Sequence, residues 1–76
     1  MAEKYSFSVI LEPQAEGGFT VLVPALPEVV TEGDTEEEAL ANAREALRAI
    51  LDYRRDHGIA IPPDAPPEIR RVIVAA

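Results

Sequence analysis

The chain has 76 residues, 14 of them Asp or Glu and seven Lys or Arg, with no Cys and a formal net charge of -7. This length predicts one domain over residues 1–76, and a hydrophobic content of 47% is too high for a disordered tail. The charge makes the chain a poor direct binder of DNA, RNA or anionic lipid, because that binding relies on Lys and Arg, and no apolar run reaches the roughly 20 residues that span a bilayer.

Two strands and a tight turn are predicted at the start of the chain. Residues 4–12 alternate between apolar and polar side chains, and residues 19–24 resume this alternation after a break that contains Gly17 and Gly18. Period-two alternation is typical of half-buried strands, and glycine supplies the positive φ that a tight turn needs. The segment therefore predicts a β-hairpin.

A third strand and a long helix are expected next. The strand is predicted over residues 28–32, after prolines interrupt the hairpin. Thr35 followed by Glu38 fits a capping box, in which Thr35 accepts from the third helical amide and Glu38 reaches back to the amide of the cap. Apolar residues then recur at i, i+3, i+4 and i+7 as far as Gly58, which predicts a helix of about 23 residues that covers the sheet.

The last part of the chain is rich in proline and then apolar. Residues 59–67 hold four of the seven Pro and are expected to run extended. The run at 72–74 predicts a last strand parallel to the first and beside it, since a crossover through a helix favours that arrangement. The fold class is α+β: a two-layer β-β-β-α-β sandwich with one long helix packed on a mostly antiparallel four-stranded sheet. The uncovered sheet face would carry Ile10, Leu22 and Ile73 and serve as an association surface.

A chain this short needs additional stabilisation, since below roughly 70–80 residues one core contributes only about 3–5 kcal/mol. Without Cys there are no disulfides and no thiolate metal sites, and a single histidine, His57, is too few for an imidazole metal cage. The sequence therefore predicts a homo-oligomer, either a dimer or a tetramer, or an obligate complex. It predicts no cofactor and no metal.

Location and origin leave weaker signals. Met1–Lys4 does not open a signal peptide, so a cytoplasmic location is expected. Scarce Asn, Gln and Met together with seven Pro are typical of proteins from thermophilic organisms. The composition is also biased toward Arg and Ala, and genomic base composition can produce that bias. Both explanations therefore stay open.

No catalytic constellation emerges from the sequence. His57 falls at the predicted helix C-terminus, where helix-dipole or packing roles suit it better than general-base chemistry. Glu36, Glu37 and Glu38 are consecutive on a helix, so their side chains point about 100° apart and do not converge on one ion. Gly17-Gly18 lacks the surrounding pattern of a phosphate loop. We expect a protein that is not an enzyme.

The order of predicted elements also matches the opening of a ribonuclease-H-like fold. Two-metal nucleases of that kind need carboxylates within the central strands. Here the first strand has acids only near its ends, at Glu3 and Glu12, and the last strand from Val72 has none. The shape is therefore expected without the active site.

Several short motifs follow one another in an order that closely resembles the HicB-like antitoxin family over residues 5–63. They are Tyr5 with Leu11-Glu12-Pro13, Glu16-Gly17-Gly18-Phe19, Val23-Pro24-Ala25-Leu26-Pro27, Gly33-Asp34-Thr35-x-x-Glu38-Ala39, Asn42-Ala43-x-x-Ala46-Leu47 and Gly58-Ile59-x-Ile61-Pro62. The resemblance implies a degraded ribonuclease-H-like fold without catalysis. It also implies that the following motif residues have structural roles: Gly17, Gly18, Pro24, Gly33, Asp34, Thr35, Glu38 and Ala39.

The resemblance also implies a partner. Better-known family members neutralise HicA, a small basic toxin that cleaves mRNA, by covering its active site. Many members carry a C-terminal DNA-binding domain, whereas this sequence ends at Ala76, so no direct DNA binding is expected. An acidic surface would attract a basic toxin. The predicted partner-binding residues are Glu28, Glu32, Asp34, Glu36 and Glu37, and the competing interpretation is a solvated acidic face that keeps the protein soluble.

Two functional hypotheses follow. The first is a non-catalytic antitoxin of a type II toxin–antitoxin system that binds and neutralises a HicA-type toxin. The alternative is an orphan HicB-like oligomeric module that binds another protein or a small ligand. An adjacent reading frame for a small basic protein would favour the first. A residual nuclease is the least favoured hypothesis. It would require metal-dependent cleavage that is abolished by substitution of Glu12 or His57.

Overall fold

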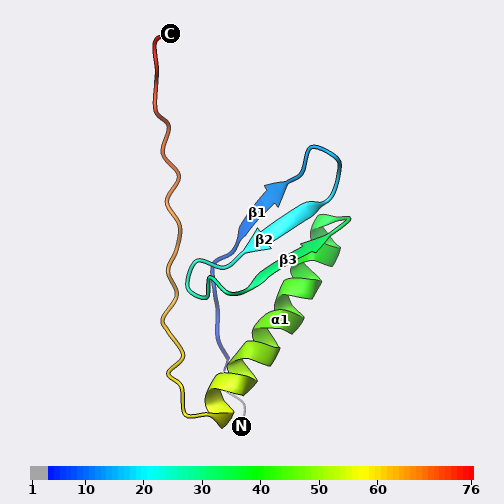
Figure 1. The fold of residues 1–76 in the computed structure, drawn as a ribbon, viewed down its shortest axis with the longest axis vertical. Helices are drawn as coiled ribbons and strands as arrows, with labels where there is room; N and C mark the ends of the chain where they lie inside the picture. Colours follow the sequence, from blue (N-terminus) through cyan, green and yellow to red (C-terminus); the bar gives the residue numbers. More distant parts are fainter. Residues whose placement is uncertain (1–3) are drawn as a thin grey trace.

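The computed structural model describes residues 4–76 and contains a three-stranded antiparallel sheet with one long helix (Figure 1). Strand β1 spans Ile10–Pro13, β2 spans Phe19–Leu22, β3 spans Val30–Gly33, and helix α1 spans Glu36–Asp56. The strand order is β1-β2-β3, so β1 and β3 form the two edges of the sheet. Helix α1 contacts β3 most extensively and β2 less. The α+β class and the two layers are confirmed, with three strands in the described chain instead of four.

The hairpin strands are shorter than predicted. Strand β1 begins at Ile10, not at residue 4, and β2 ends at Leu22, not at residue 24. After β2, the amide of Leu26 donates to the Val23 carbonyl (3.0 Å) and the amide of Val29 donates to the Leu26 carbonyl (2.9 Å). These two turns fold the chain out of the sheet, so no strand lies opposite residues 4–9, and for the same reason β3 begins at Val30.

The register places alternate residues on opposite faces of the sheet. Leu11, Val21 and Thr31 are paired across the three strands, and Val21 on this row is fully buried beneath α1. The next row joins Ile10, Leu22 and Val30. Because successive residues point to opposite faces, this row lies on the uncovered face, as predicted for Ile10 and Leu22. Ile73, the third residue predicted there, is not in the sheet.

Two adjoining hydrophobic clusters form the core. One joins β2 to α1 through Val21, Ala39 and Ala43, and the other is built from the turns after β2 through Val23, Leu26 and Val29. The alanines bring α1 close to the sheet. The closest approach is at Gly33, where a Cβ would lie 2.4 Å from the Ala39 amide nitrogen. Any side chain there would collide with helix backbone, so the glycine is required by packing.

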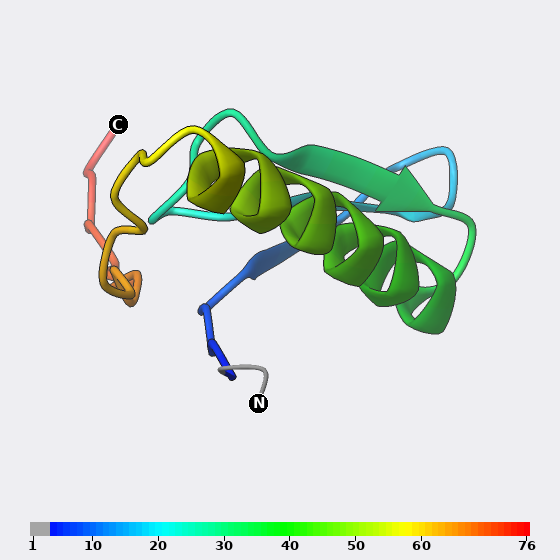
Figure 2. The ribbon, with the colours of Figure 1, turned by 90° about the horizontal axis from the view of Figure 1, so that it is seen from below.

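The predicted fourth strand is wrong for the described chain. Residues 66–76, called here the C-terminal arm, form no strand and project from the domain (Figures 1 and 2). The arm carries the most exposed large apolar side chains of the described residues, from 78% for Val74 to 92% for Ile73. The ribonuclease-H-like description, which needs that strand, remains a prediction.

The register of the chain explains why the arm does not join its own sheet. The Asp64 carboxylate accepts hydrogen bonds from the Ser8 amide (2.8 Å) and the Ser8 hydroxyl (2.7 Å), and beyond this point the chain runs in the same general direction as β1 (Figure 1). At about 3.3 Å per residue, residues 66–69 come level with β1. Pro66 and Pro67 have no amide proton to donate there, and Val72–Val74 lies beyond the end of β1.

Candidate functional site

The five acidic residues predicted to bind a partner lie in two separate places, and all five are exposed. Four of them lie where β3 leads into α1, and we call this group the acidic end: Glu32, Asp34, Glu36 and Glu37. The fifth, Glu28, precedes β3 at the opposite end of that strand. The structure therefore brings four of the predicted residues together and separates the fifth from them.

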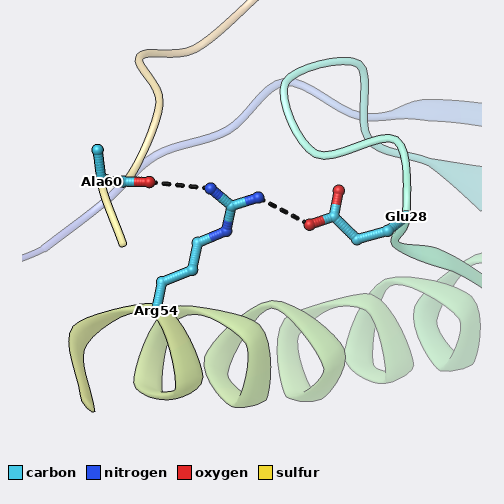
Figure 3. Close-up of polar contacts among 3 residues, drawn as sticks. All are labelled: Glu28, Arg54 and Ala60. Carbon is cyan, nitrogen blue, oxygen red and sulfur yellow. Dashed lines mark hydrogen bonds and ion pairs between the residues drawn. The ribbon is translucent and has the colours of Figure 1, made fainter. Parts of the chain in front are cut away.

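Glu28 belongs to a structural ion pair. Its carboxylate accepts a hydrogen bond from Arg54 Nη2 at 2.9 Å, while Arg54 Nη1 donates to the Ala60 carbonyl at 2.9 Å (Figure 3). The Arg54 hydrogen bond is the main reason that the pKa of Glu28 lies below its ordinary value. Arg54 thus joins the loop before β3 to the chain that leaves α1, and the charge of Glu28 is already paired within the molecule.

The acidic end carries charge that is not paired in this way. Among residues 4–76, no Lys or Arg forms an ion pair with Glu32, Asp34, Glu36 or Glu37. A depression of about 460 Å³ adjoins them, lined by the hairpin turn, the end of β3 and the start of α1. Glu32 and Asp34 line this depression together with Glu38. Its walls therefore offer carboxylate oxygens to a ligand.

The capping box fixes the start of α1. The Thr35 hydroxyl accepts from the Glu38 amide (3.1 Å), as predicted. The Glu38 carboxylate accepts from the Asp34 amide (3.2 Å), one residue before the cap, and not from the Thr35 amide as predicted. The backbone of Asp34 is therefore held by the helix, which positions the acidic end between β3 and the first turn of α1.

Two further contacts hold this region in place. Asn42 on α1 donates through Nδ2 to the Glu32 carbonyl on the edge strand (2.8 Å). In the hairpin turn, Gly17 and Gly18 have φ of 102° and 82°, and a Cβ on Gly18 would lie 2.9 Å from the Gly33 carbonyl oxygen. Both glycines are recognisable in the sequence as turn residues, but an exposed helical asparagine gives no local signal of a contact with a neighbouring strand.

The remaining family-motif residues serve packing. Pro24 is half-buried beside the buried Val23, and Ala39 is fully buried against β2. Gly33, Thr35 and Glu38 act through the close approach and the cap. The motif residues therefore build the support of the acidic end, while the exposed acids make up its surface.

A second surface feature lies at the other edge of the sheet. A groove of about 650 Å³ separates residues 5–9 from α1, and we call it the α1 groove. Its apolar lining includes Phe7, Val9, Leu40 and Leu47, and three arginines, Arg44, Arg48 and Arg55, also line it. The groove could not be predicted from the sequence, because it exists only where residues 4–9 have no strand or helix directly against them.

The structure gives the remaining candidate residues no catalytic arrangement. The His57 ring stacks on Tyr53 with centroids 4.1 Å apart, and its Nδ1 lies 2.8 Å from the Tyr53 carbonyl oxygen, at the end of α1. Among residues 4–76, no group of three or more His, Asp or Glu side chains could hold a metal ion. Within the same residues, no helix is long and apolar enough to cross a membrane.

Comparison with known proteins gives this arrangement a context. UPF0150 protein Ta0767 of Thermoplasma acidophilum is 41% identical over 63 residues, which cover 83% of this chain and 91% of that protein. Antitoxin HicB 1 of Photorhabdus laumondii is 42% identical over 60 residues, or 79% of this chain and 39% of the relative. Antitoxin HicB of Escherichia coli K12 is 35% identical over 60 residues, or 79% of this chain and 44% of the relative.

These relatives differ in extent. The chain spans most of the UPF0150 protein but less than half the length of the two proteins named as antitoxins. A family profile described as "HicB_like antitoxin of bacterial toxin-antitoxin system" matches residues 4–75, almost all of the chain. The match includes the hairpin, the capping box and α1, whose residues support the acidic end. The chain belongs to the HicB-like antitoxin family.

Proposed function

We propose that this protein is the antitoxin of a type II toxin–antitoxin system and that it neutralises a small, basic HicA-type mRNA-cleaving toxin by binding it, with no catalysis of its own. Family membership and the names of the Photorhabdus laumondii and Escherichia coli relatives support an antitoxin role. The observation that carries the proposal for this chain is the acidic end, where four exposed carboxylates lie together without an ion-pair partner among the described residues.

The acidic end is suited to a basic partner for two reasons. Its carboxylates accept charge-assisted hydrogen bonds from Lys and Arg, and the net charge of -7 steers a cation toward the protein during diffusion. The acidic end is also held in place by the capping box and by the Asn42 contact, so little ordering is needed on binding. Glu28 is left out of the proposed contact because Arg54 already pairs its charge.

The test is association with a cognate toxin. A small basic HicA-type toxin from an adjacent reading frame would be co-expressed with the chain, and both the rescue of cell growth and the association rate would be measured. In the triple variant Glu32→Lys, Glu36→Lys and Glu37→Lys, we expect an association rate about tenfold lower at low ionic strength, with the difference shrinking as salt is added.

The matched control reverses three exposed acids elsewhere on α1: Glu45→Lys, Asp52→Lys and Asp56→Lys. It produces the same change in net charge away from the acidic end, so steering by total charge alone would slow both variants equally. Helical circular dichroism would verify that both variants fold. Equal rates in the two variants would contradict binding at the acidic end, and failure to bind or neutralise the toxin at all would contradict the antitoxin function.

The second candidate function is an oligomeric module that binds another protein or a small ligand. The α1 groove is the observation that favours it, because its apolar floor and arginines do not suit a basic toxin. A chain that forms a stable oligomer, does not bind a small basic HicA-type toxin and keeps this behaviour after the triple reversal would support the module.

A further inference from the structure

The C-terminal arm exposes more apolar surface than a small monomer can easily keep in water. The chain has 6165 Å² of accessible surface, against about 4,600 Å² for a compact chain of 8.3 kDa. Its radius of gyration is 14.9 Å, whereas a compact chain of this length has about 11 Å. The excess surface is about twice the roughly 800 Å² that each partner buries in a standard interface.

The arm cannot hide this surface on its own sheet. The Ser8–Asp64 hydrogen bonds fix which residues of the chain lie beside β1, and the first of these are Pro66 and Pro67. The residues able to form a β ladder, 69–74, come after them. None of residues 59–76 lines the α1 groove. The arm therefore carries a strand sequence that has no edge to join within its own chain.

The edge that is left open offers what the arm lacks. Strand β1 has a partner strand on only one side, and the α1 groove lies along residues 5–9, which precede it. The groove has an apolar lining, and the final run from Val72 to Ala76 is apolar and has no charged side chain. Val72 and Val74 lie on one face of an extended arm, so both can point into the groove together; Arg70 shares that face, and the groove lining includes the acidic Asp52.

From these observations we infer that two copies of the chain exchange their C-terminal arms, with residues 69–74 of each copy seated over the α1 groove of the other. Charge separates this surface from the toxin site. The groove lining has three arginines and one acid, Asp52, whereas the acidic end has four acids and stays exposed, so a strongly basic toxin is attracted to the acidic end. The inference does not depend on the proposed antitoxin function.

The first experiment measures the mass of the full chain by sedimentation at concentrations from 1 to 100 µM, about the range in which small dimers dissociate. We expect twice the chain mass of 8.3 kDa. In Val72→Asp with Val74→Asp, burying carboxylates in the groove should raise the dimer dissociation constant at least about 100-fold. Both side chains are exposed in the monomer, so the variant keeps the monomer fold, which circular dichroism would verify.

The control is Val30→Asp, which introduces a carboxylate on β3, where Val30 is 57% exposed and does not line the α1 groove. We expect this variant to stay a dimer. A monomeric wild-type chain would overturn the inference. A dimer that survives the arm substitutions, or one that Val30→Asp dissociates instead, would also overturn it, because the copies would then associate through another surface.

The second experiment asks whether the arm crosses between copies. The chain has no Cys, so Ser6→Cys in the groove and Val74→Cys in the arm can be introduced on separate copies that carry different tags. On oxidation we expect a disulfide between the two copies, and little crosslinking between Val74→Cys and Glu37→Cys. If a chain with both cysteines forms its disulfide within a monomer, the arm closes on its own groove and the inference is wrong.

Discussion

Leu26 and Ile73 are both large aliphatic residues in extended or turn segments, yet Leu26 is fully buried and Ile73 is 92% exposed. The first belongs to the packed unit, residues 9–57, and the second to the C-terminal arm. The packed unit has an alternating hairpin and a helix whose apolar face lies over it. The arm has an apolar strand sequence and no edge within reach. The contrast shows that apolar sequence becomes core only where the chain supplies a second surface.

The sharpest test of this contrast is a matched truncation in each region. We expect Leu26→Ala to lower the free energy of unfolding by about 2–5 kcal/mol, since it removes a buried side chain and leaves a cavity. A domain of this size has little more stability than that, so the variant should be largely unfolded at 25 °C. Urea unfolding followed by circular dichroism measures the effect.

Ile73→Ala is the counterpart in the arm. Measured at a concentration at which the chain sediments as a monomer, it should change the free energy of unfolding by less than about 0.5 kcal/mol. A larger loss would mean that the arm packs on its own domain and that the two regions do not differ as the structure indicates.

A second prediction concerns the close approach of α1 to the sheet at Gly33. Gly33→Ala should lower the free energy of unfolding by about 1–3 kcal/mol, because its Cβ would meet helix backbone that cannot rotate away. Gly17→Ala is the control, since nothing lies within 4 Å of its Cβ and only its positive φ of 102° opposes the change. Gly33 does not have a positive φ, so a Gly33→Ala variant as stable as the wild-type chain would contradict the close approach to α1.

A smaller effect is expected at the boundary between β3 and α1. Thr35→Ala removes the acceptor of the Glu38 amide and should cost about 1 kcal/mol of stability. Thr35→Ser keeps the hydroxyl and should retain most of it. Thermal unfolding of the three proteins would separate the outcomes, and a Ser variant as unstable as the Ala variant would argue against a capping role.

The smallest effect is expected where the packed unit meets the arm. Hydrogen bonds from Ser8 are the main cause that lowers the pKa of Asp64 below its ordinary value. Because the folded-state pKa is the lower one, the contribution of this contact is complete above the ordinary carboxyl pKa and is lost as the pH falls through the lowered value. The protection of the Ser8 amide proton, which is its NMR exchange rate relative to the intrinsic rate at the same pH, should therefore fall in acid.

The substitution Asp64→Asn should quicken the same exchange at neutral pH, whereas Asp56→Asn on α1 should leave it unchanged. If Ser8 exchange did not respond to Asp64→Asn, the contact would not set the position of the arm along β1, and Pro66 and Pro67 would not be held beside β1.

Much of the candidate site could be predicted because its signals are local. Thr35 and Glu38 mark a helix start wherever they occur, and the glycine pair marks a turn, so the support of the acidic end was recognisable in the sequence. The separation of Glu28 from the other acids was not recognisable. It depends on Arg54, which lies 26 positions further along the chain and meets Glu28 only when α1 packs on β3.

The sequence by itself determined the hairpin, the length and cap of α1, the acidic charge and the family, because each depends on neighbouring residues or on their order. Only the tertiary structure decided how far the strands extend and what becomes of the arm. The turns after Leu22 shorten β1, and the hydrogen bonds of Asp64 bring prolines level with the open edge. Strand pairing requires two segments that lie side by side and have amide protons to donate. Whether this holds depends on the tertiary structure and not on the order of residues along the chain.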